Sequence, residues 1–337
     1  MKKIIIVGGG VAGLSALNRL ADLGVSATLI EAGDYPSHKI CGEFFSPGCL
    51  PILNNWDLEP VEKIDRMSFI TKNRALSFSL PVAARSQSRF DFDVRLVERA
   101  EKMGATVITK TKVKEIREYD VVLENGETLP HTDLIMSSGR LFATPPLFRY
   151  VGLKAHFKGI DIQNTLELYS FSGGYGGLSP IENGCANFTC LMPISDDNKD
   201  QLLQKLFEEV PQLQERLQKG DRVYDEWMMS KVPQFGIKQT PAWPNTYFIG
   251  DAAGTVPPAS GLGLSLAITS GYMAAEYVMK GNYQGFRKAW VAKYKKSFTY
   301  AHLLHRFMMS PSLSNSAIML GKLFTTLPET LFMKTRF

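Results

Sequence analysis

Apolar positions near the start of the chain change from a continuous run to a helical spacing and back. Residues 4–7 form an apolar run, and a second run covers residues 27–30. The apolar residues between them recur every three positions, which is typical of one face of a helix. These positions are Val11, Leu14, Leu17 and Leu20. The order predicts a strand, a helix and a second strand, the repeating unit of parallel sheets.

Alternating patterns follow. Residues 67–71 and 76–80 are β-like and predict an excursion out of the first unit. A helix is predicted from near Phe92 to Gly104, followed by a strand over residues 105–108. Further strands and helices are predicted with glycine turns between many of them. The strands cover residues 112–136 in β alternation around Gly126, then 165–171, 175–181, 186–192 and 247–250, and the helices cover 197–219, 262–280 and 283–309.

These elements predict an α/β fold with three parts. A Rossmann-like nucleotide-binding domain with a parallel sheet is expected to be discontinuous, and an antiparallel β-sheet domain is expected to contact the substrate. C-terminal helices complete the chain. The nucleotide-binding domain is expected to comprise residues 1–48, 86–149 and 244–281, the substrate domain 49–85 and 150–243, and the C-terminal helical region 282–337.

Composition limits the location of the protein. The chain has 337 residues, of which 45% are hydrophobic and 21% charged, as is ordinary for a globular protein. The N-terminal apolar run is too short for an export signal, and no uncharged stretch is long enough to span a membrane. The cysteines show no metal-like spacing, so no metal is expected. Reduced thiols in a cytoplasmic protein are the expectation.

Charge is unevenly distributed. The formal net charge is +5, and from Gly281 onward nine Lys or Arg residues accompany a single acid, Glu329. Several aromatic and methionine side chains lie in the same segment. It therefore suits peripheral contact with an anionic membrane or with an acidic electron carrier. A helical cap with solvated lysines is the alternative, and nothing in the chain indicates a nucleic-acid ligand.

A glycine turn follows the first predicted strand. Gly8 permits a tight turn, Gly10 lets the backbone approach a diphosphate, and Gly13 allows close helix packing. The diphosphate would lie at the helix N-terminus. Glu31, at the end of the next strand, is placed to accept hydrogen bonds from the adenosine ribose and argues against a 2′-phosphate. A glycine turn with a solvated acid and no ligand is the alternative.

A second glycine-rich segment lies roughly 240 residues later. Gly250 and Asp251 end a predicted strand, which would bring a carboxylate near the ribityl hydroxyls of a flavin. Pro258, Gly261 and Gly263 would let a loop and a helix start approach the flavin ring. A domain that binds only a nicotinamide nucleotide does not need this segment, so the pair of segments favours FAD.

These motifs resemble a known family. The fingerprint GGGVAG with Glu31, the segment RFDFDVRLVERAEKMGA and the segment GDAAGTVPPASGLG are similar to FAD-dependent oxidoreductases of the p-hydroxybenzoate hydroxylase class. KICGE at residues 39–43 and GGYGGLSPIENG at residues 173–184 resemble its geranylgeranyl-reductase-like branch. The resemblance covers about residues 1–280.

The resemblance implies roles for individual residues. Arg89 is expected to lie against the flavin or its diphosphate, and the backbone of Val113 against adenine. Cys41 and Gly42 are expected beside the substrate cavity near the flavin, with Lys39 and Glu43 flanking them. The expected cofactor contacts are Gly8, Gly10, Ala12, Gly13, Glu31, Lys39, Cys41, Gly42, Arg89, Val113, Gly250, Asp251, Pro258, Gly261, Leu262 and Gly263.

The substrate residues depart from the family pattern. Cys41 is the candidate catalytic residue as a proton donor, and a small buried residue in a loop is the alternative. Tyr175 and Pro180 match the family's aromatic cavity cluster, whereas Gly177 and Ser179 replace two aromatic residues. The replacement leaves room for a wider or different substrate. Trp227 does not reproduce the motif of flavin-dependent halogenases, which disfavours halogenation.

We therefore expect an FAD-dependent oxidoreductase that transfers hydride between the flavin and a hydrophobic organic substrate, lipid-like or polyketide-like. One alternative is an FAD-dependent monooxygenase that uses NAD(P)H and O2. The other is a non-catalytic flavin-binding protein that docks to a membrane or a partner. The chain has no second glycine fingerprint for NAD(P)H, so this electron donor is left open.

Overall fold

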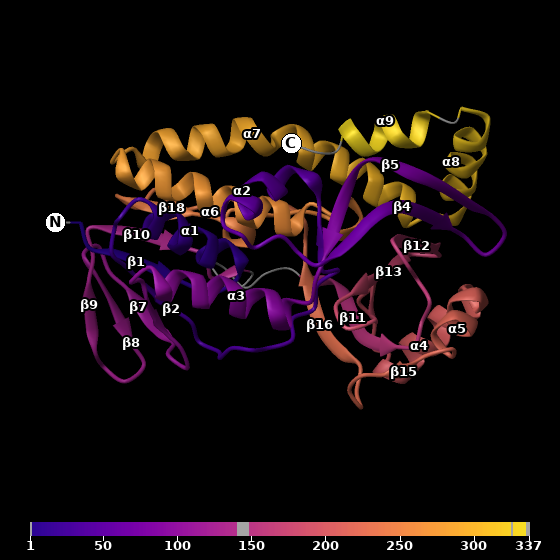
Figure 1. Ribbon diagram of the computed structural model, residues 1–337, viewed down its shortest axis with the longest axis horizontal. Helices are drawn as coiled ribbons and strands as arrows, with labels where there is room; N and C mark the ends of the chain where they lie inside the picture. Colours follow the sequence, from indigo (N-terminus) through magenta and orange to yellow (C-terminus); the bar gives the residue numbers. More distant parts are fainter. Residues whose placement is uncertain (1, 140–147, 325, 335–337) are drawn as a thin grey trace.

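Figure 1 shows the protein as a computed structural model, which describes residues 2–139, 148–324 and 326–334. Two large sheets lie at opposite ends of the long axis of the molecule. The long helix α7 (Tyr283–Met308) runs along one side and contacts strands of both sheets (Figure 1). The two sheets therefore meet in the middle of the molecule, where a site can draw on both.

The first sheet has five strands, all parallel to their neighbours, in the order β18-β10-β1-β2-β6. The β1 strand is buried along its whole length, as its continuous apolar run predicts. Helices α1, α3 and α6 pack with this sheet in one core, to which α7 also contributes. The strands are β1 (Ile4–Val7), β2 (Ala27–Ile30), β6 (Thr106–Ile108), β10 (Asp133–Met136) and β18 (Thr246–Phe248), and the helices are α1 (Val11–Asp22), α3 (Arg89–Lys102) and α6 (Gly263–Met279).

Local signals set the ends of these helices. Ser88 caps α3, because its side chain accepts a hydrogen bond of 3.2 Å from the backbone N–H of Asp91. Gly104, with φ +87°, follows the end of the same helix. The helices α1 and α6 lie against each other, and a Cβ at Gly271 would collide with the carbonyl oxygen of Ala12. This close approach holds the N-terminal and distal glycine segments together.

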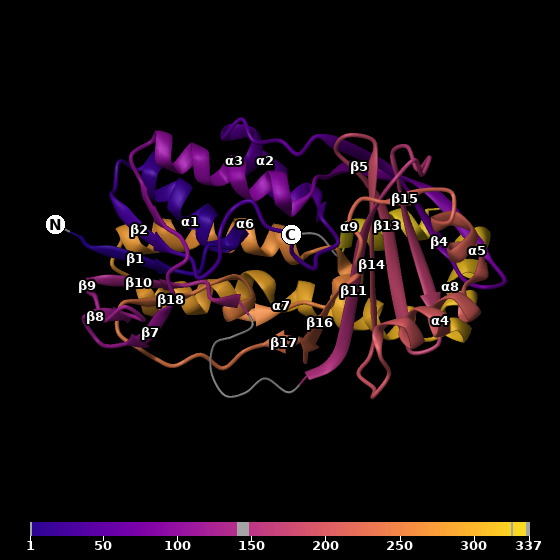
Figure 2. The same cartoon turned by 90° about the horizontal axis from the view of Figure 1, so that it is seen from below.

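The second sheet has the order β15-β11-β14-β13-β12-β4-β5-β3, with β16 also on β11 (Figure 2). The predicted antiparallel sheet needs one correction, because β4 and β12 are parallel. No hairpin joins these two strands, so the antiparallel direction is not imposed on them. The strands are β3 (Phe44–Phe45), β4 (Glu62–Ile70), β5 (Ala75–Ser86), β11 (Phe148–Lys158), β12 (Thr165–Phe171), β13 (Gly174–Ile181), β14 (Cys185–Pro193), β15 (Asp221–Arg222) and β16 (Met228–Pro233).

The single helix predicted over residues 197–219 is wrong. Two helices occupy the segment, α4 (Lys199–Glu209) and α5 (Pro211–Leu217). Proline disfavours helical backbone at the residue before it, and Val210 accordingly has φ −135° and ψ 73°. The strand predicted over residues 247–250 ends at Phe248, and a 3-10 turn over Gly250–Ala252 follows it.

Smaller elements complete the described chain. A three-stranded sheet covers the region predicted to alternate around Gly126, whose φ is +87°. The remaining elements are β7 (Val113–Ile116), β8 (Asp120–Leu123), β9 (Thr128–Pro130), β17 (Gly236–Ile237), β19 (Gly254–Thr255), α2 (Leu50–Asn55), α8 (Pro311–Leu323) and α9 (Leu327–Lys334). Within the described ranges no helix is long and apolar enough to cross a membrane.

Buried apolar side chains form separate cores under the two large sheets. The first contains the parallel sheet with α1, α3, α6 and the aromatic residues of α7, and the second contains β11–β14 with α4 and α5. Cys49, Leu53 and Trp56 pack into the first core, although they belong to the segment assigned to the substrate domain. The domain boundaries drawn from the sequence remain a prediction.

Candidate active site

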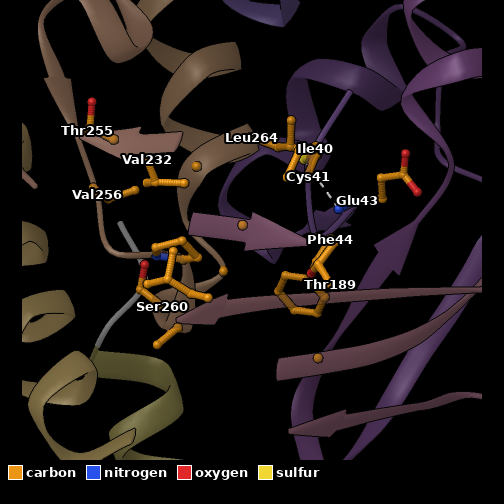
Figure 3. Close-up of a pocket in the computed structure, with 18 of the residues that line it drawn as sticks. Ile40, Cys41, Glu43, Phe44, Thr189, Val232, Thr255, Val256, Ser260 and Leu264 are labelled. Atoms are coloured by element: carbon orange, nitrogen blue, oxygen red, sulfur yellow. Dashed lines mark hydrogen bonds between the residues drawn. The ribbon is translucent and has the colours of Figure 1, made fainter. Parts of the chain in front are cut away.

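A cavity of about 360 Å³ lies where the two large sheets meet (Figure 3). One wall comes from the glycine turn after β1 and from the segment around residues 250–267. The opposite wall comes from strands β11–β14 of the mixed sheet, and the loop at residues 40–44 lies between them. The two glycine segments, roughly 240 residues apart in sequence, therefore line one space.

The glycine turn fits a bound diphosphate. Gly8 has φ +102°, and a Cβ there would lie 2.5 Å from the carbonyl oxygen of Ser137. Gly10 lines the cavity, and a Cβ there would have no described atom within 4 Å, so its backbone is open to a ligand. The first turn of α1 has neither a side-chain cap nor an acidic residue. Its backbone N–H groups are therefore placed to bind an anion.

Glu31 lies directly after β2, beside the glycine turn. Its two oxygens accept hydrogen bonds from the backbone N–H groups of Gly9 (2.6 Å) and Gly33 (2.9 Å). A carboxylate has further lone pairs, so ribose hydroxyls can also donate to it. The backbone N–H of Thr111 donates to the carbonyl of Glu31, which brings the chain leading to Val113 past the same point. Val113 is not among the described lining residues, and its contact with adenine stays a prediction.

The distal segment lines the same cavity. Asp251, Pro258 and Gly261 contribute to its wall, and α6 begins there at Gly263 without an acid in its first turn. Two helix N-termini, those of α1 and α6, thus face one space, and both favour negative charge. Leu262 is fully buried in the first core and is not among the described lining residues, so its contact with the cofactor stays a prediction.

Thr255 supplies a polar atom without a protein partner. Its side chain lines the cavity and is 3% exposed, and its hydroxyl makes no hydrogen bond to any residue that the structure describes. Buried hydroxyls are normally hydrogen-bonded. This hydroxyl is thus available to a ligand, and with the open glycine turn and the two helix N-termini the residues present fit FAD.

The loop with Cys41 lies between the two walls (Figure 3). Cys41 is half-buried and lines the cavity together with Gly42. The Sγ atom of Cys41 accepts a hydrogen bond of 3.4 Å from the backbone N–H of Glu43, and its carbonyl accepts one of 3.1 Å from Asn187. Lys39 contributes its backbone rather than its side chain, because its carbonyl accepts a bond of 2.9 Å from Lys154. These bonds fix the loop between the wall formed by the two glycine segments and the wall formed by the mixed sheet.

A buried ionic cluster holds the next residue of this loop. Glu43 accepts hydrogen bonds from Lys154 Nζ (2.5 Å), His156 Nε2 (2.8 Å) and the backbone N–H of Arg89 (2.8 Å). Glu43 and Lys154 are both 0% exposed. Burial alone raises the pKa of Glu43, but the neighbouring Lys154 and His156 outweigh it and hold the pKa below its ordinary value. The carboxylate is therefore ionised.

Sequence reasoning missed Lys154 and His156. The signal was present, because the two residues lie two positions apart in the apolar strand β11 and therefore share one face of it. A lysine on the inner face of a strand needs a buried partner. What the sequence did not reveal is that Glu43, more than a hundred residues earlier, is that partner.

Arg89 lines the cavity, as expected, but its charge already has a partner. Its guanidinium makes two hydrogen bonds of 2.6 Å with the carboxylate of Asp93, one turn further along α3. This bidentate pair fixes the position of the guanidinium. Its contact with the cofactor stays a prediction.

Strand β13 forms part of the opposite wall. Tyr175, Gly177 and Ser179 alternate along the strand and share the face that lines the cavity. Pro180 lies on the other face, where its carbonyl accepts a hydrogen bond from Ser86, and it is not among the described lining residues. The structure thus places Tyr175 in the wall and Pro180 behind it, because successive strand residues point to opposite faces.

Gly177 leaves apolar space in this wall. A Cβ built there would lie 3.5 Å from Leu168 and 3.9 Å from Leu166, an ordinary contact without a collision. Both leucines also line the cavity. An aromatic side chain at this position would extend among them, so its absence widens the apolar part of the cavity.

Curated proteins of known name resemble the chain over most of its length. No protein-family profile matches the chain. It is 25% identical to the menaquinone reductase of Mycolicibacterium smegmatis, over 91% of this chain and 85% of that protein. It is also 24% identical to the ubiquinone hydroxylase UbiM of Neisseria meningitidis (96% and 77% covered) and 23% identical to the digeranylgeranylglycerophospholipid reductase of Thermoplasma volcanium (81% and 76%). The chain is an FAD-dependent oxidoreductase, and these relatives support its likeness to the p-hydroxybenzoate hydroxylase class.

Solved structures of other proteins share the fold. The flavin-dependent brominase Bmp2 matches with a TM-score of 0.82 at 16% identity, over 99% of this chain and 93% of that one. A geranylgeranyl bacteriochlorophyll reductase-like protein of Thermoplasma acidophilum matches with a TM-score of 0.73 at 20% identity, over 98% and 99%. The predicted FAD-dependent redox action on a hydrophobic substrate, with a geranylgeranyl-reductase-like relative, is confirmed.

Proposed function

We propose that this oxidoreductase reduces an apolar lipid of the isoprenoid type, such as a prenylated quinone or a polyprenyl lipid. The observation that carries the proposal is the single cavity, which joins both predicted cofactor segments to an apolar wall of the mixed sheet. That wall includes Leu166, Leu168, Leu191, Val232 and Phe235. Relatives named for menaquinone and for digeranylgeranylglycerophospholipid support this substrate class.

The chain's own residues would bind and orient the reactants. The N-termini of α1 and α6 favour a diphosphate and any negative charge on the cofactor. Bound FAD supplies the hydride. The Glu43 cluster holds the Cys41 loop, so that Cys41 faces the space between the predicted flavin segment and the apolar wall. The cavity lining is mainly apolar, and it would exclude water from the reacting atoms.

Hydroxylation is the second candidate function. The relative named as a ubiquinone hydroxylase matches 96% of this chain, and it favours an FAD-dependent monooxygenase acting with NAD(P)H and O2. A non-catalytic flavoprotein is the third candidate. The geometry of the cavity serves all three, so the distinction rests on reactivity.

One experiment separates these candidates. The FAD-loaded protein is reduced without oxygen and mixed in a stopped-flow instrument with menadione or a polyprenyl lipid, with and without O2. Reoxidation by the lipid or the quinone without O2 supports the proposed reduction. Reoxidation only with O2, with an oxygenated product, supports hydroxylation, and inertness towards both supports the binding role. Consumption of NADH or NADPH in the same mixtures tests the electron donor.

We propose that the enzyme acts in the cytoplasm and reaches its lipid from an anionic membrane surface through α8. Leu313, Leu320 and Leu323 share one exposed face of this helix, and exposed Phe324 follows it. Ile318 and Ser314 on the other face are buried. Exposed Arg306 and Lys322 lie in the last turns of α7 and α8. An exposed apolar helix face in a basic C-terminal segment suits anionic lipid headgroups better than a neutral partner.

A further inference from the structure

Tyr175 is a polar residue of the wall formed by β11–β14, and its hydroxyl lies at hydrogen-bonding distance from a histidine. The Tyr175 hydroxyl lies 3.2 Å from Nδ1 of His305, and the other ring nitrogen of His305, Nε2, lies 3.1 Å from the hydroxyl of Tyr150. The three side chains come from β13, α7 and β11. A continuous chain of hydrogen bonds therefore leads from the cavity through a histidine to a second tyrosine.

The surrounding packing fixes this chain. Tyr175 is 4% exposed and His305 7% exposed, whereas Tyr150 is half-buried. The rings of Tyr150 and Phe235 stack with their centroids 5.2 Å apart. The rings of His305 and Phe235 form a T-shaped contact with the same distance between centroids. The rings are thus held at hydrogen-bonding distance, and the chain runs from a buried end at the cavity to a more accessible end at Tyr150.

His305 is neutral in this position. Burial lowers its pKa to about 4, and the charge of nearby His302 acts in the same direction. A neutral imidazole has one N–H donor and one acceptor nitrogen. It can therefore accept a proton from one tyrosine while it donates one to the other, and the exchange of tautomers moves a proton along the chain.

The end of this hydrogen-bond chain at Tyr175 lies beside the second glycine-rich segment, residues 250–263, which is predicted to contact the flavin. The hydroxyl oxygen of Tyr175 accepts a hydrogen bond of 3.2 Å from the backbone N–H of Ala259, the neighbour of Pro258. Both residues line the cavity with Tyr175. This N–H stabilises the oxygen at the moment when it has given up its proton, as donors aimed at developing negative charge do.

We propose that Tyr175 donates the proton that accompanies hydride transfer and that His305 and Tyr150 return a proton to it. The inference rests on the proposed reduction and names the group that completes it. The hydride that bound FAD would supply carries two electrons and would form a bond to one atom of a C=O or C=C group. The π bond breaks, and the neighbouring atom takes the proton of the Tyr175 hydroxyl. The proton of His305 Nδ1–H then restores Tyr175, while Nε2 accepts one from Tyr150, and Tyr150, the more accessible end of the chain, regains a proton from solvent.

Tyr175→Phe is the direct test, because it removes the hydroxyl and keeps the ring. We expect FAD content to match the wild type, while anaerobic reoxidation by menadione or a polyprenyl lipid falls about 10²- to 10⁴-fold, the usual range for general acid catalysis. The wild-type reaction is expected to be slower in D2O, and this isotope effect should change in the variant. Tyr169→Phe is the control, since Tyr169 is a buried tyrosine of β12 that bonds Glu167 instead.

His305 acts through Tyr175, so its test needs a signal that a structural role would not give. His305→Ala is expected to slow the same reaction and to recover part of the rate when free imidazole is added, with no recovery in Tyr175→Phe. Equal rates in the wild type and Tyr175→Phe would overturn the proton path alone. A wild-type protein that neither menadione nor a polyprenyl lipid reoxidises would overturn the proposed reduction and this path together.

Discussion

Gly177 sets the width of the apolar wall at the scale of one residue. We predict that Gly177→Trp fills space between Leu166 and Leu168 and slows anaerobic reoxidation by a polyprenyl lipid at least tenfold more than reoxidation by menadione. The bulky side chain would exclude the long polyprenyl lipid, whereas the smaller menadione would still fit in the cavity. Flavin content, read from the absorbance spectrum, should stay at the wild-type level. Equal slowing with both substrates would contradict the steric explanation.

Asp251 is expected to bind the cofactor through its carboxylate. Loss of a hydrogen bond to a charged group costs about 1.5–3 kcal/mol, so Asp251→Ala should weaken FAD binding roughly 10- to 100-fold. Flavin retained after gel filtration measures the effect. The exposed residue Asp225 provides a control, because Asp225→Ala should retain FAD like the wild type. Unchanged retention in Asp251→Ala would refute the assigned role.

The Lys154–Glu43 pair makes a prediction about stability. Lys154→Met leaves a buried carboxylate with less compensation, a loss of about 3–5 kcal/mol in the free energy of unfolding. The double variant with Glu43→Gln should be more stable than Lys154→Met alone, since the uncompensated charge is gone. Urea denaturation measures both, with exposed Lys219→Met as the control. Additive losses in the double variant would argue against direct coupling.

Acid provides a second test of Glu43. Its pKa in the folded protein is below the ordinary value of 4.5, so the folded state binds this proton less readily than the unfolded chain. The associated stability is present above pH 4.5 and decreases as the pH falls towards the folded pKa. We expect the wild type to lose stability over this interval more steeply than Glu43→Gln. Parallel curves in urea titrations at stepwise lower pH would exclude the contribution of Glu43.

At the scale of elements, local patterns predicted structure well and long-range pairing poorly. The unit β1–α1–β2 agrees with the sequence prediction because neighbouring residues determine its periodicity. The parallel contact of β4 with β12 joins strands almost a hundred residues apart, which no local pattern encodes. The break before Pro211 was encoded locally, and it shows that proline outweighs a continuous amphipathic pattern.

The residues of the candidate site also fall into those that the local sequence predicted and those that it did not. Its glycine segments were predicted because their backbone requirements select glycine directly. Lys154, His156 and His305 were not, because each acquires its partner only when distant strands and helices pack together. A histidine in an amphipathic helix has no sequence signal that distinguishes a core residue from one beside a cavity. Tertiary contacts decide its role.

Helix α8 makes its own prediction. Leu320→Glu places a charge in the exposed apolar face, and loss of one buried leucine costs about 1.5–3 kcal/mol. Binding to vesicles that contain phosphatidylglycerol should therefore fall at least tenfold in a flotation assay. Val223→Glu, at an exposed apolar residue elsewhere, should bind like the wild type. No binding by the wild type at low salt, or equal binding by Leu320→Glu, would contradict the membrane contact.

At the scale of the whole molecule, the two sheets divide the work of the site. The parallel sheet and its helices contribute the predicted cofactor segments, and the mixed sheet contributes the apolar wall with Tyr175. Helix α7 contacts both sheets and brings His305 to the point where they meet. The predicted substrate specificity and the predicted cofactor binding therefore lie on different sheets and can vary independently.

The position of β18 in the parallel sheet has a kinetic consequence. This edge strand pairs with β10 and lies after residue 240, whereas all the described strands of the mixed sheet lie within residues 44–233. During synthesis the strands that form the apolar wall emerge before β18 and the glycine-rich segment that follows it. Pairings so distant in sequence form slowly. Flavin uptake should therefore be among the last events of folding, and the appearance of bound flavin absorbance during refolding would report that the parallel sheet is complete.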